Sequence, residues 1–396
     1  MRSKVLVPVL APLACVALAA CGGSGNGNTI TIGSSLPLTG QLASFGPLIQ
    51  AGEQYAVSEV NQSGGVRIGR TKKKVTLIVQ DNASDPNKAT QEARTMVLND
   101  NVAGLLGSVS PPLTIPIGDI ADSQQVPFVT SQTPEEAWMA GNKSGWHYSW
   151  DLFFDEAQMT DLQFQTANLV STNKRIALFN DNENDGIAMG NLWTAKAPKF
   201  GYTIAYHTTF PIGTTDYSNF IAQAKAANAQ ILIAQMIPPD AFALWKQMKS
   251  LGYQPKVAFC EKCAAQNAWE QALAALGNGT SVAGFWTPSR GTGSAQLARQ
   301  FQGRYSGLDL GQVAAAYTAA KVLLDAIGKA GSTDAKKINA AIAQTDGDYP
   351  LGHVQFDPHN RYLVPAIELQ WQRSNAVQVY PARAGADIHA PVAGLG

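Results

Sequence analysis

ITIGSSLPLTG, residues 30–40, contains the first predicted strand of the folded chain and the turn that follows it. The isoleucine and threonine residues of its first half are typical of a strand. Residues 41–61 then show apolar residues at helical spacing, and NQSGG at 61–65 ends that predicted helix. A strand followed directly by a helix is the first unit of a parallel sheet.

The same alternation of short apolar strand and amphipathic helix continues along the chain. Repeated units of this kind predict parallel sheets, and ligands bind beyond the carboxyl ends of their strands. Two such sheets would leave a cleft between them. We expect further strands at residues 75–79, 102–107, 126–129, 175–179, 231–234 and 257–259, and helices at residues 86–98, 186–198, 216–228 and 239–251.

Length and composition restrict the class of protein. The chain has 396 residues, which predicts two domains or two lobes around separate cores. It carries 29 Lys and Arg against 29 Asp and Glu, so its charge is low and evenly mixed. This balance lacks the electrostatic footprint of a nucleic-acid binder and argues against a disordered chain or an acidic tail. Beyond the N-terminus we expect no apolar stretch of the roughly 18–20 residues that span a membrane.

The N-terminus has the pattern of a secretory signal, with two basic residues ahead of an apolar run. LAACG at 18–22 resembles a bacterial lipobox, which predicts cleavage after residue 20 and lipidation of Cys21. Residues 21–28, rich in Gly, Ser and Asn, are then a flexible tether. The alternative is an ordinary secretory signal with an incidental cysteine. Lipid chains would hold the protein on the outer side of a cell membrane without a spanning helix.

Four spaced motifs occur in the first third of the chain: IGSSLPLTG (32–40), ASFG (43–46), NQSGGV (61–66) and QDNASDP (80–86). In this order they resemble the opening of type I periplasmic binding proteins, in the branched-chain amino acid or leucine-binding group of ABC importers. The resemblance extends from about Ile30 to Tyr380. It implies an α/β fold of two Rossmann-like lobes, joined by three crossovers, with a ligand cleft between them.

The resemblance also implies where the lobes divide. Lobe 1 is expected at residues 29–150 plus 287–346, and lobe 2 at residues 151–286 plus 347–385. Residues 386–396 are left as a C-terminal tail. Aromatic residues at 146–154 and at 285–286 coincide with the first two crossovers. We expect them to pack the hinge, and the alternative is that they line the pocket of a hydrophobic ligand.

In this family, hydroxyls and backbone N–H groups after two lobe-1 strands hold the carboxylate of the solute. The corresponding residues here are Ser110 after the first strand, and Ser131, Gln132 and Thr133 after the second. Phe45 occupies the position of an aromatic wall. Helix capping by each hydroxyl, and an ordinary core contact for Phe45, are the equally weighted alternatives.

The first of these turns departs from the leucine-binding pattern. Pro111 and Pro112 stand where consecutive serines are usual, and proline has neither a hydroxyl nor an N–H. In lobe 2, Asp185 replaces the aromatic residue that usually stacks on the solute. Glu261 lies two residues from the position of the usual acidic partner, which is Cys263. The solute class therefore stays open among amino acids, small carboxylates, amides, polyols and aromatic compounds.

Two motifs suggest other chemistry, and each has a simpler explanation. DNENDG at 181–186 resembles a calcium loop, but position twelve is Leu192 where a bidentate Glu is required. Cys260 and Cys263 form a C-x-x-C motif, which in an exported protein predicts a local disulfide and not a redox centre. The five histidines show no metal-ligand spacing. We expect no metal and no cofactor.

The sequence thus predicts a monomeric, lipid-anchored solute-binding protein that delivers a small molecule to an ABC permease and performs no chemistry. No nucleic-acid partner is expected. Two alternatives stay open. One is a sensor subunit whose closed form is detected by a membrane receptor, and the other is a redox protein that acts through the C-x-x-C motif.

Overall fold

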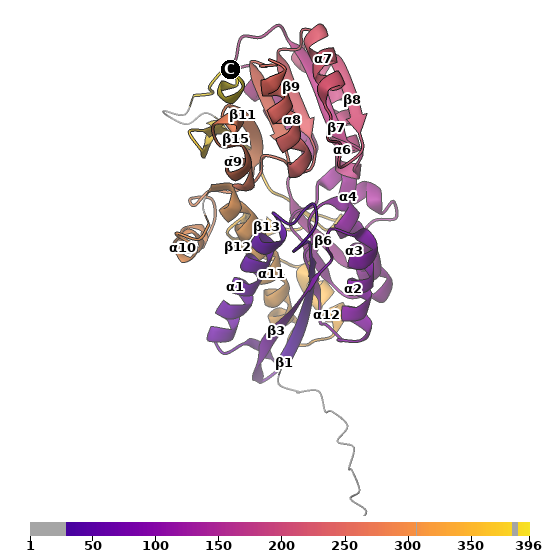
Figure 1. Ribbon diagram of the computed structural model, residues 1–396. Coiled ribbons are helices and arrows are strands. Elements are labelled where there is room, and N and C mark those ends of the chain that lie inside the picture. Colours follow the sequence, from indigo (N-terminus) through magenta and orange to yellow (C-terminus); the bar gives the residue numbers. More distant parts are fainter. Residues whose placement is uncertain (1–28, 306, 382–386) are drawn as a thin grey trace, which may run out of the picture.

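The computed structural model describes residues 29–305, 307–381 and 387–396. It contains two lobes, each built on a seven-stranded sheet (Figure 1). The signal segment, Cys21 and the tether lie outside the described residues, as does part of the segment before the C-terminal tail. The α/β fold of two parallel-sheet lobes predicted from the sequence is confirmed.

The first sheet is parallel except for one edge strand. β2 pairs antiparallel with β3, while every other neighbouring pair is parallel. Across the sheet, the strands run in the order β14 (Arg361–Leu363), β6 (Ser149–Phe153), β5 (Phe128–Thr130), β4 (Leu105–Leu106), β1 (Thr29–Leu36), β3 (Thr71–Asp81) and β2 (Val66–Ile68).

Helices of the first lobe pack on this sheet. α1 packs along α11, where a Cβ on Gly52 would lie 2.3 Å from the Val313 carbonyl oxygen, so only glycine allows this approach. Asp85 caps α2, as its position before Pro86 predicts. These helices are α1 (Gly46–Gln62), α2 (Pro86–Leu98), α3 (Pro111–Gln124), α4 (Glu135–Gly141), α10 (Ser294–Gln300), α11 (Gly307–Ala330) and α12 (Ala335–Ile342).

The second sheet has a parallel centre and an antiparallel edge. Its central strands β9, β10 and β11 are buried along their whole length, because helices cover both faces. β15 and β16 add the antiparallel edge. The strands run in the order β16 (Asn375–Tyr380), β15 (Ile367–Gln372), β11 (Thr280–Gly284), β10 (Val257–Glu261), β9 (Ile231–Gln235), β7 (Arg175–Asp181) and β8 (Thr203–Phe210).

Helices of the second lobe connect these strands. Each lies close to the range predicted from apolar spacing where one was predicted. They are α5 (Glu156–Ala167), α6 (Asn184–Lys196), α7 (Ser218–Ala226), α8 (Pro238–Ser250) and α9 (Ala268–Leu273). Short 3-10 helices also occur in the described residues, at η1 (Ala197–Phe200), η2 (Ala274–Gly277) and η3 (Ala393–Leu395).

The chain passes between the sheets three times, after β6, after β11 and after β14. The third crossing corrects the expected boundary at residue 346. A small hairpin, β12 (Asp346–Tyr349) and β13 (Gly352–Gln355), comes first, and β14 then pairs with β6 of the first sheet. A three-residue strand at a sheet edge has too little periodicity to be recognised from sequence.

α11 corrects a second expectation. Within the described residues, this helix of 24 residues is long and apolar enough to cross a membrane, although the sequence was expected to hold no such stretch beyond its N-terminus. Its most apolar window is 83% buried inside the protein. Burial on this scale identifies α11 as a core helix of the first lobe.

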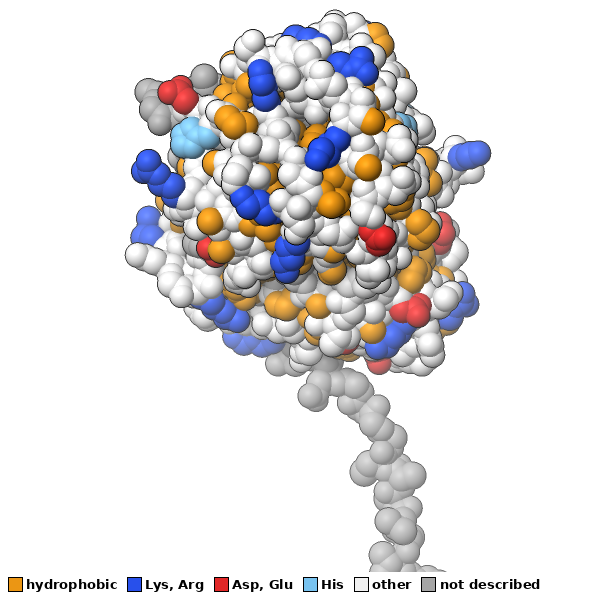
Figure 2. All heavy atoms as spheres, turned by 45° about the horizontal axis from the view of Figure 1, so that its top comes forward, with side chains coloured by type: hydrophobic (Ala, Val, Ile, Leu, Met, Phe, Trp, Pro, Cys, Tyr) orange, Lys and Arg blue, Asp and Glu red, His pale blue; other side chains and the backbone are white. Residues whose placement is uncertain are grey.

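The surface around the second lobe carries scattered charge. Figure 2 shows Lys and Arg side chains separated by neutral and apolar atoms on this face, without one continuous charged patch. The large exposed apolar side chains are few and lie singly, at Leu98, Leu169, Ile187, Leu251 and Leu363.

Candidate functional site

A cavity lies between the two lobes, beyond the carboxyl ends of several strands. Both lobes contribute side chains to its wall, as the topology of parallel sheets predicts. Five of the predicted ligand-binding residues line it: Phe45, Ser110 and Gln132 from lobe 1, and Asp185 and Glu261 from lobe 2. The further lining residues are Val109, Pro134, Phe153, Phe154, Glu156, Met159, Met189, Gln235, Lys262, Ala265, Ala283, Phe285 and Gln312.

Ser131 and Thr133 do not belong to this lining. Both side chains are buried in the turn after β5, and the hydroxyls of Thr130 and Thr133 lie 3.3 Å apart. Gln132, which lies between Ser131 and Thr133 in the sequence, does line the cavity. The sequence pattern marks the turn but cannot distinguish its inward from its outward residues.

Ser110 has an unusual backbone conformation at the cavity wall. Its φ is 67°, a left-handed value that costs a residue other than glycine free energy, and such residues concentrate at ligand-binding sites. Ser110 precedes α3, but its side chain makes no capping hydrogen bond. Its hydroxyl instead lies 3.3 Å from Glu183 Oε2 of lobe 2. The capping alternative therefore does not describe this serine.

Lys262 bridges the lobes and was not among the predicted residues. Its Nζ donates to Ser110 Oγ of lobe 1 at 2.9 Å, to Glu183 Oε2, and to Asp185 Oδ2 at 3.4 Å. Lys262 also has a positive φ of 60°. Its side chain is only 8% exposed, so this ion-pair cluster is sheltered from water. The sole signal in the sequence was a lysine inside the C-x-x-C turn.

Three acids share this one cation. Burial disfavours the charged lysine, but Asp185, Glu183 and Asp181 outweigh that effect and raise the pKa of Lys262 well above its usual range. Burial likewise raises the pKa of Asp181 to about 8, although Lys262 opposes that rise. The pKa of Glu183 is also raised, chiefly by burial. Lys262 therefore stays protonated, while burial disfavours the ionised forms of Asp181 and Glu183.

Glu261 lies on the same wall and is fully buried. It accepts hydrogen bonds from Gln163 Nε2 and from the Ala283 backbone N–H, which lies 3.1 Å from Oε2. Burial raises its pKa to about 7, against the lowering effect of these bonds. Glu368 on β15 is also fully buried, and burial together with the charge of Glu261 raises its pKa well above the usual range. Glu261 thus has its own partners before any solute binds.

Aromatic residues of the crossovers form the apolar wall. Phe153 stacks on Phe154 with ring centroids 4.1 Å apart, and Phe285 meets Phe153 edge-on at 5.5 Å. All three rings line the cavity. Trp146 instead stacks on Trp138 inside lobe 1, away from the cavity. Only part of the aromatic cluster therefore packs the hinge, and three phenylalanines face the solute space.

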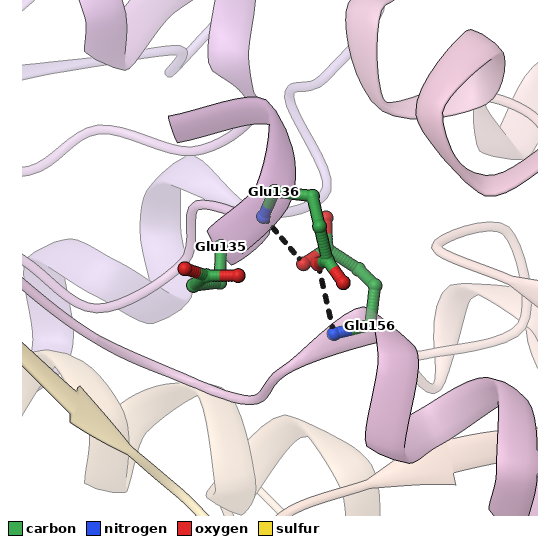
Figure 3. Close-up of side chains that lie close together, drawn as sticks. All are labelled: Glu135, Glu136 and Glu156. Atoms are coloured by element: carbon green, nitrogen blue, oxygen red, sulfur yellow. Dashed lines mark hydrogen bonds between the residues drawn. The ribbon is translucent and has the colours of Figure 1, made fainter. Parts of the chain in front are cut away.

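Two helix N-termini meet at the first crossover, and each is capped by a glutamate of the other. Glu136 of α4 accepts from the backbone N–H groups of Glu156 and Ala157, while Glu156 Oε2 accepts from the Glu136 N–H at 2.8 Å (Figure 3). Burial, reinforced by Asp155, raises the pKa of Glu136 to about 7. This exchange ties lobe 1 to the first helix of lobe 2.

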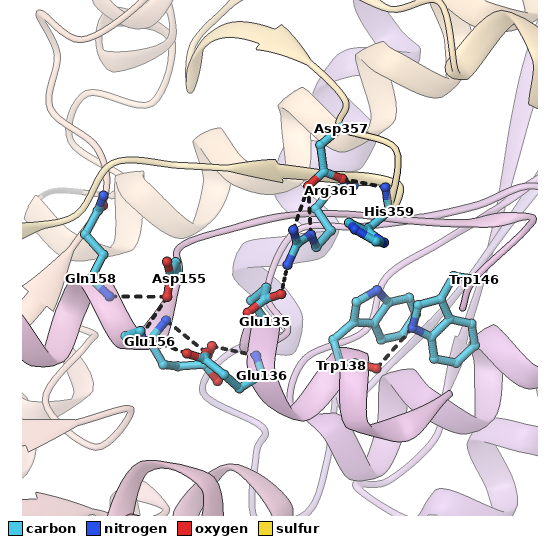
Figure 4. A network of polar contacts seen from close by, with 11 residues as sticks. Glu135, Glu136, Trp138, Trp146, Asp155, Glu156, Gln158, Asp357, His359 and Arg361 are labelled. Atoms are coloured by element: carbon cyan, nitrogen blue, oxygen red, sulfur yellow. Dashed lines mark hydrogen bonds and ion pairs between the residues drawn. The ribbon is translucent and has the colours of Figure 1, made fainter. Parts of the chain in front are cut away.

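The same crossover is tied to β14. Arg361 pairs with Glu135 of α4 and with Asp357, whose Oδ2 lies 2.7 Å from Arg361 Nη2 (Figure 4). The third crossover follows β14 directly. β14, which precedes the third crossover, is therefore tied by charge to α4 of the first lobe.

Two groups of acids have oxygens close enough to hold a cation, namely Glu135, Glu136 and Glu156, and Asp181, Glu183 and Asp185. The first group is engaged with Arg361 and with backbone N–H groups, and the second with Lys262. Helix capping and ion pairing account for both arrangements. DNENDG forms the end of β7 and the start of α6, as a strand-to-helix turn at the cavity.

A disulfide joins Cys260 and Cys263, with their Cα atoms 5.7 Å apart. It encloses Glu261 and Lys262, two residues of the cavity wall. Both cysteines are at most 1% exposed. Thiol exchange needs access to a sulfur atom, so this burial favours a structural bond over the redox alternative.

The fold and the cavity between its lobes define a two-lobed α/β solute-binding protein. The family model for periplasmic binding proteins matches residues 29–372, and the chain belongs to this family. The family predicted from the four N-terminal motifs is confirmed.

Relatives of known name support this assignment. The chain is 25% identical over 397 residues to a Leu/Ile/Val-binding protein homolog of Brucella abortus, with 91% of this chain and 94% of the relative covered. It is 24% identical over 339 residues to a leucine-, isoleucine-, valine-, threonine- and alanine-binding protein of Pseudomonas aeruginosa, with 83% and 86% covered.

Solved structures share the fold. A leucine binding protein from Thermotoga maritima superposes with a TM-score of 0.78 at 20% identity, covering 88% of this chain and 97% of that one. A branched-chain amino acid transporter substrate binding protein from Streptococcus pneumoniae, in complex with isoleucine, gives a TM-score of 0.76 at 19% identity, with 92% and 100% covered.

Proposed function

We propose that the protein captures a small solute between its lobes outside the cytoplasm and delivers it to the permease of an ABC importer, without chemical conversion of the solute. The observation that carries this proposal is the shared cavity, across which Lys262 of lobe 2 reaches Ser110 of lobe 1 at 2.9 Å. A solute that contacts both walls in the closed state alone shifts the population toward closure.

The permease then distinguishes occupied from empty protein by its shape. Three crossovers are compatible with a hinge, because lobes joined at a few chain segments can rotate as rigid bodies. The same closed form could instead be detected by a receptor, which is the sensor alternative. Uptake of the solute by vesicles that hold the permease distinguishes import from sensing.

The proposal includes an anchor at the membrane surface. Lipidation of Cys21 and the tether at 21–28 would keep a monomer close to its permease. The disulfide between Cys260 and Cys263 agrees with an oxidising compartment. Radiolabelled palmitate incorporated into the wild-type chain, and absent from Cys21→Ser, tests this part.

The solute is an amino acid or a related small polar or aromatic compound. The names of the relatives favour aliphatic amino acids, and the phenylalanines of the wall provide an apolar surface. Asp185, which stands where an aromatic residue is usual, and Glu261 offer the carboxylates that a buried ammonium needs.

A thermal-shift screen of protein lacking residues 1–21 tests the function. The library contains amino acids, amides, amines, polyols and aromatic acids. A ligand that binds only the folded state at one hundred times its Kd adds about 2.7 kcal/mol of stability. We expect at least one compound to raise the Tm and to appear as a 1:1 complex with monomer by native mass spectrometry. The proposal is contradicted if no compound of the library raises the Tm.

A further inference from the structure

The cavity wall contains buried hydrogen-bond acceptors without partners. Four such atoms belong to lining residues: Gln132 Oε1, Glu156 Oε1, Asp185 Oδ1 and Gln235 Oε1. Each of these residues is at least nine-tenths buried, with relative exposures of 1% for Glu156 and Asp185, 3% for Gln132 and 4% for Gln235. Leaving a buried polar atom unpaired costs about 1–3 kcal/mol, so this set indicates a ligand that donates hydrogen bonds.

The orientation of the two amides follows from their partners. Gln132 Nε2 donates to the Gln312 carbonyl oxygen, and Gln235 Nε2 donates to Asp185 Oδ2 at 2.8 Å. A carbonyl oxygen and a carboxylate oxygen only accept hydrogen bonds, so neither amide can be flipped without losing its bond. The oxygen of each amide is therefore the atom left without a hydrogen-bond partner.

The donors of the same wall are already engaged. All three N–H groups of Lys262 have partners, and Ser110 Oγ lies between Lys262 and Glu183. Among the described side chains that line the cavity, the unpartnered buried atoms are all acceptors. The turn that would hold a carboxylate has lost donors as well, because Pro111 and Pro112 have no N–H.

The ionisable side chains of the wall also favour a solute that donates hydrogen bonds. The wall carries three carboxyl groups, Glu156, Asp185 and Glu261, against the single cation Lys262, which is already paired with Glu183 and Asp185. A solute carboxylate would find no unpaired cation among the described residues that line the cavity. An ammonium would meet opposite charge and, beside it, the faces of Phe153, Phe154 and Phe285.

We infer that the solute is an organic amine with an apolar or aromatic body and no free carboxylate, and that its ammonium donates to the free oxygens of Glu156 and Asp185. Amines derived from amino acids and amino-acid amides belong to this class. This inference rests on the proposed function, because it names the solute class of the same cavity.

Two sets of matched compounds test the solute class by isothermal titration with protein lacking residues 1–21. One set is leucine, leucinamide, 3-methylbutylamine and 4-methylpentanoate, and the other is phenylalanine, phenylalaninamide, phenethylamine and 3-phenylpropanoate. We expect the amine or the amide of at least one set to bind at least tenfold more tightly than the amino acid, and the acid not to bind. An amino acid or acid that binds more tightly than the matched amine overturns the inference.

Two isosteric variants test the contacts. In Glu156→Gln and Asp185→Asn, the amide oxygen can keep the existing bonds to the Glu136 N–H or to Gln235 and Lys262, while the amide nitrogen replaces the free acceptor. We expect each to weaken amine binding at least tenfold. Glu270→Gln makes the same chemical change outside the cavity and serves as the control. Unchanged amine binding in both cavity variants overturns the assigned contacts.

The outcomes separate this inference from the proposed function. A library compound without an amine that binds 1:1 in the cavity refutes the amine class and leaves the solute-binding function intact. Failure of every compound, including both matched sets, contradicts the function and the inference together.

Discussion

The two walls of the cavity differ in their chemistry. Lobe 1 contributes neutral groups, namely Phe45, Gln132, Gln312 and Ser110, of which Ser110 has a left-handed backbone conformation just before α3. Lobe 2 contributes ionisable groups, among them Asp185 in the first turn of α6, and Glu261 and Lys262 in a turn closed by a disulfide. The comparison suggests that the first wall sets the shape and orientation of the solute and that the second sets its charge.

Loss of the one cation from the lobe-2 wall is expected to have the largest effect. Lys262→Met leaves Asp181, Glu183 and Asp185 without a counter-charge, so the free energy of unfolding at pH 7.5 falls by about 3–5 kcal/mol. The loss shrinks at pH 5, because the pKa values of Asp181 and Glu183 are raised and these two acids take up protons there. Urea unfolding at both pH values measures it.

The matched control is Lys246→Met, at an exposed position of α8. It is expected to change stability by less than about 0.5 kcal/mol. A Lys262→Met protein as stable as this control at pH 7.5 would show that the charged cluster does not support lobe 2.

An acid buried in lobe 1 without any cation provides the contrast. Glu53 accepts one hydrogen bond from Ser34 Oγ at 3.1 Å, and burial raises its pKa to about 8. A pKa raised in the folded state means that the folded protein binds the extra proton. Stability from this residue is therefore greatest below about pH 4.5 and declines as the pH rises to about 8, by at most about 1.4 kcal/mol per pH unit.

Glu53→Gln is expected to remove this decline. The free energy of unfolding, measured for wild type and variant between pH 5 and pH 8, gives two curves whose difference changes steadily with pH. Glu270→Gln should keep the wild-type slope. Parallel curves for wild type and Glu53→Gln would mean that Glu53 is not the titrating group.

The disulfide of the lobe-2 wall has an intermediate effect. It closes a very short loop, so the double variant Cys260→Ser with Cys263→Ser should lose about 2 kcal/mol of stability. Solute binding should persist at a temperature where the variant is folded, because neither sulfur is needed for contact with the solute. A measurable thiol–disulfide exchange activity in the wild type, absent from this variant, would favour the redox alternative.

The smallest effect is expected on the lobe-1 wall. Ser110→Ala removes the hydroxyl that lies between Lys262 and Glu183, at a cost of about 1 kcal/mol in stability. Solute affinity should fall by more than this, since the hydroxyl joins the two walls in the closed state. Ser171→Ala, on an exposed loop, is the control for both measurements. Equal solute affinity of Ser110→Ala and wild type would show that the Ser110 hydroxyl does not contribute to solute binding.

Much of this fold follows from local sequence patterns. The strand at residues 29–36 and the helix capped by Asp85 were predictable from β-branched residues, capping and proline position. β14 was not, because its three residues are recruited to the first sheet by pairing with β6, a long-range contact without a local signal. The third crossover was misplaced for that reason.

The cavity was predictable only in part. The ends of the strands predict which turns line the cavity, and these turns contain Ser110, Gln132, Asp185 and Glu261. They do not predict which side chains of a turn reach the cavity. Ser131 and Thr133 were therefore predicted to bind the solute although they do not line the cavity. Lys262 was not predicted because its role depends on ion pairs with Glu183 and Asp185, which lie some 80 residues away along the sequence. Contacts between lobes depend on three-dimensional closure, which local patterns do not encode.

The most direct test of the account is an affinity measurement across both walls. Isothermal titration with the tightest compound of the screen would compare wild type, Ser110→Ala, Asp185→Asn and the exposed control Ser171→Ala. We predict one solute per monomer, with weaker binding when either wall is altered and unchanged binding in the control. Binding that is unaffected by both Ser110→Ala and Asp185→Asn would contradict the claim that the solute is held between the lobes.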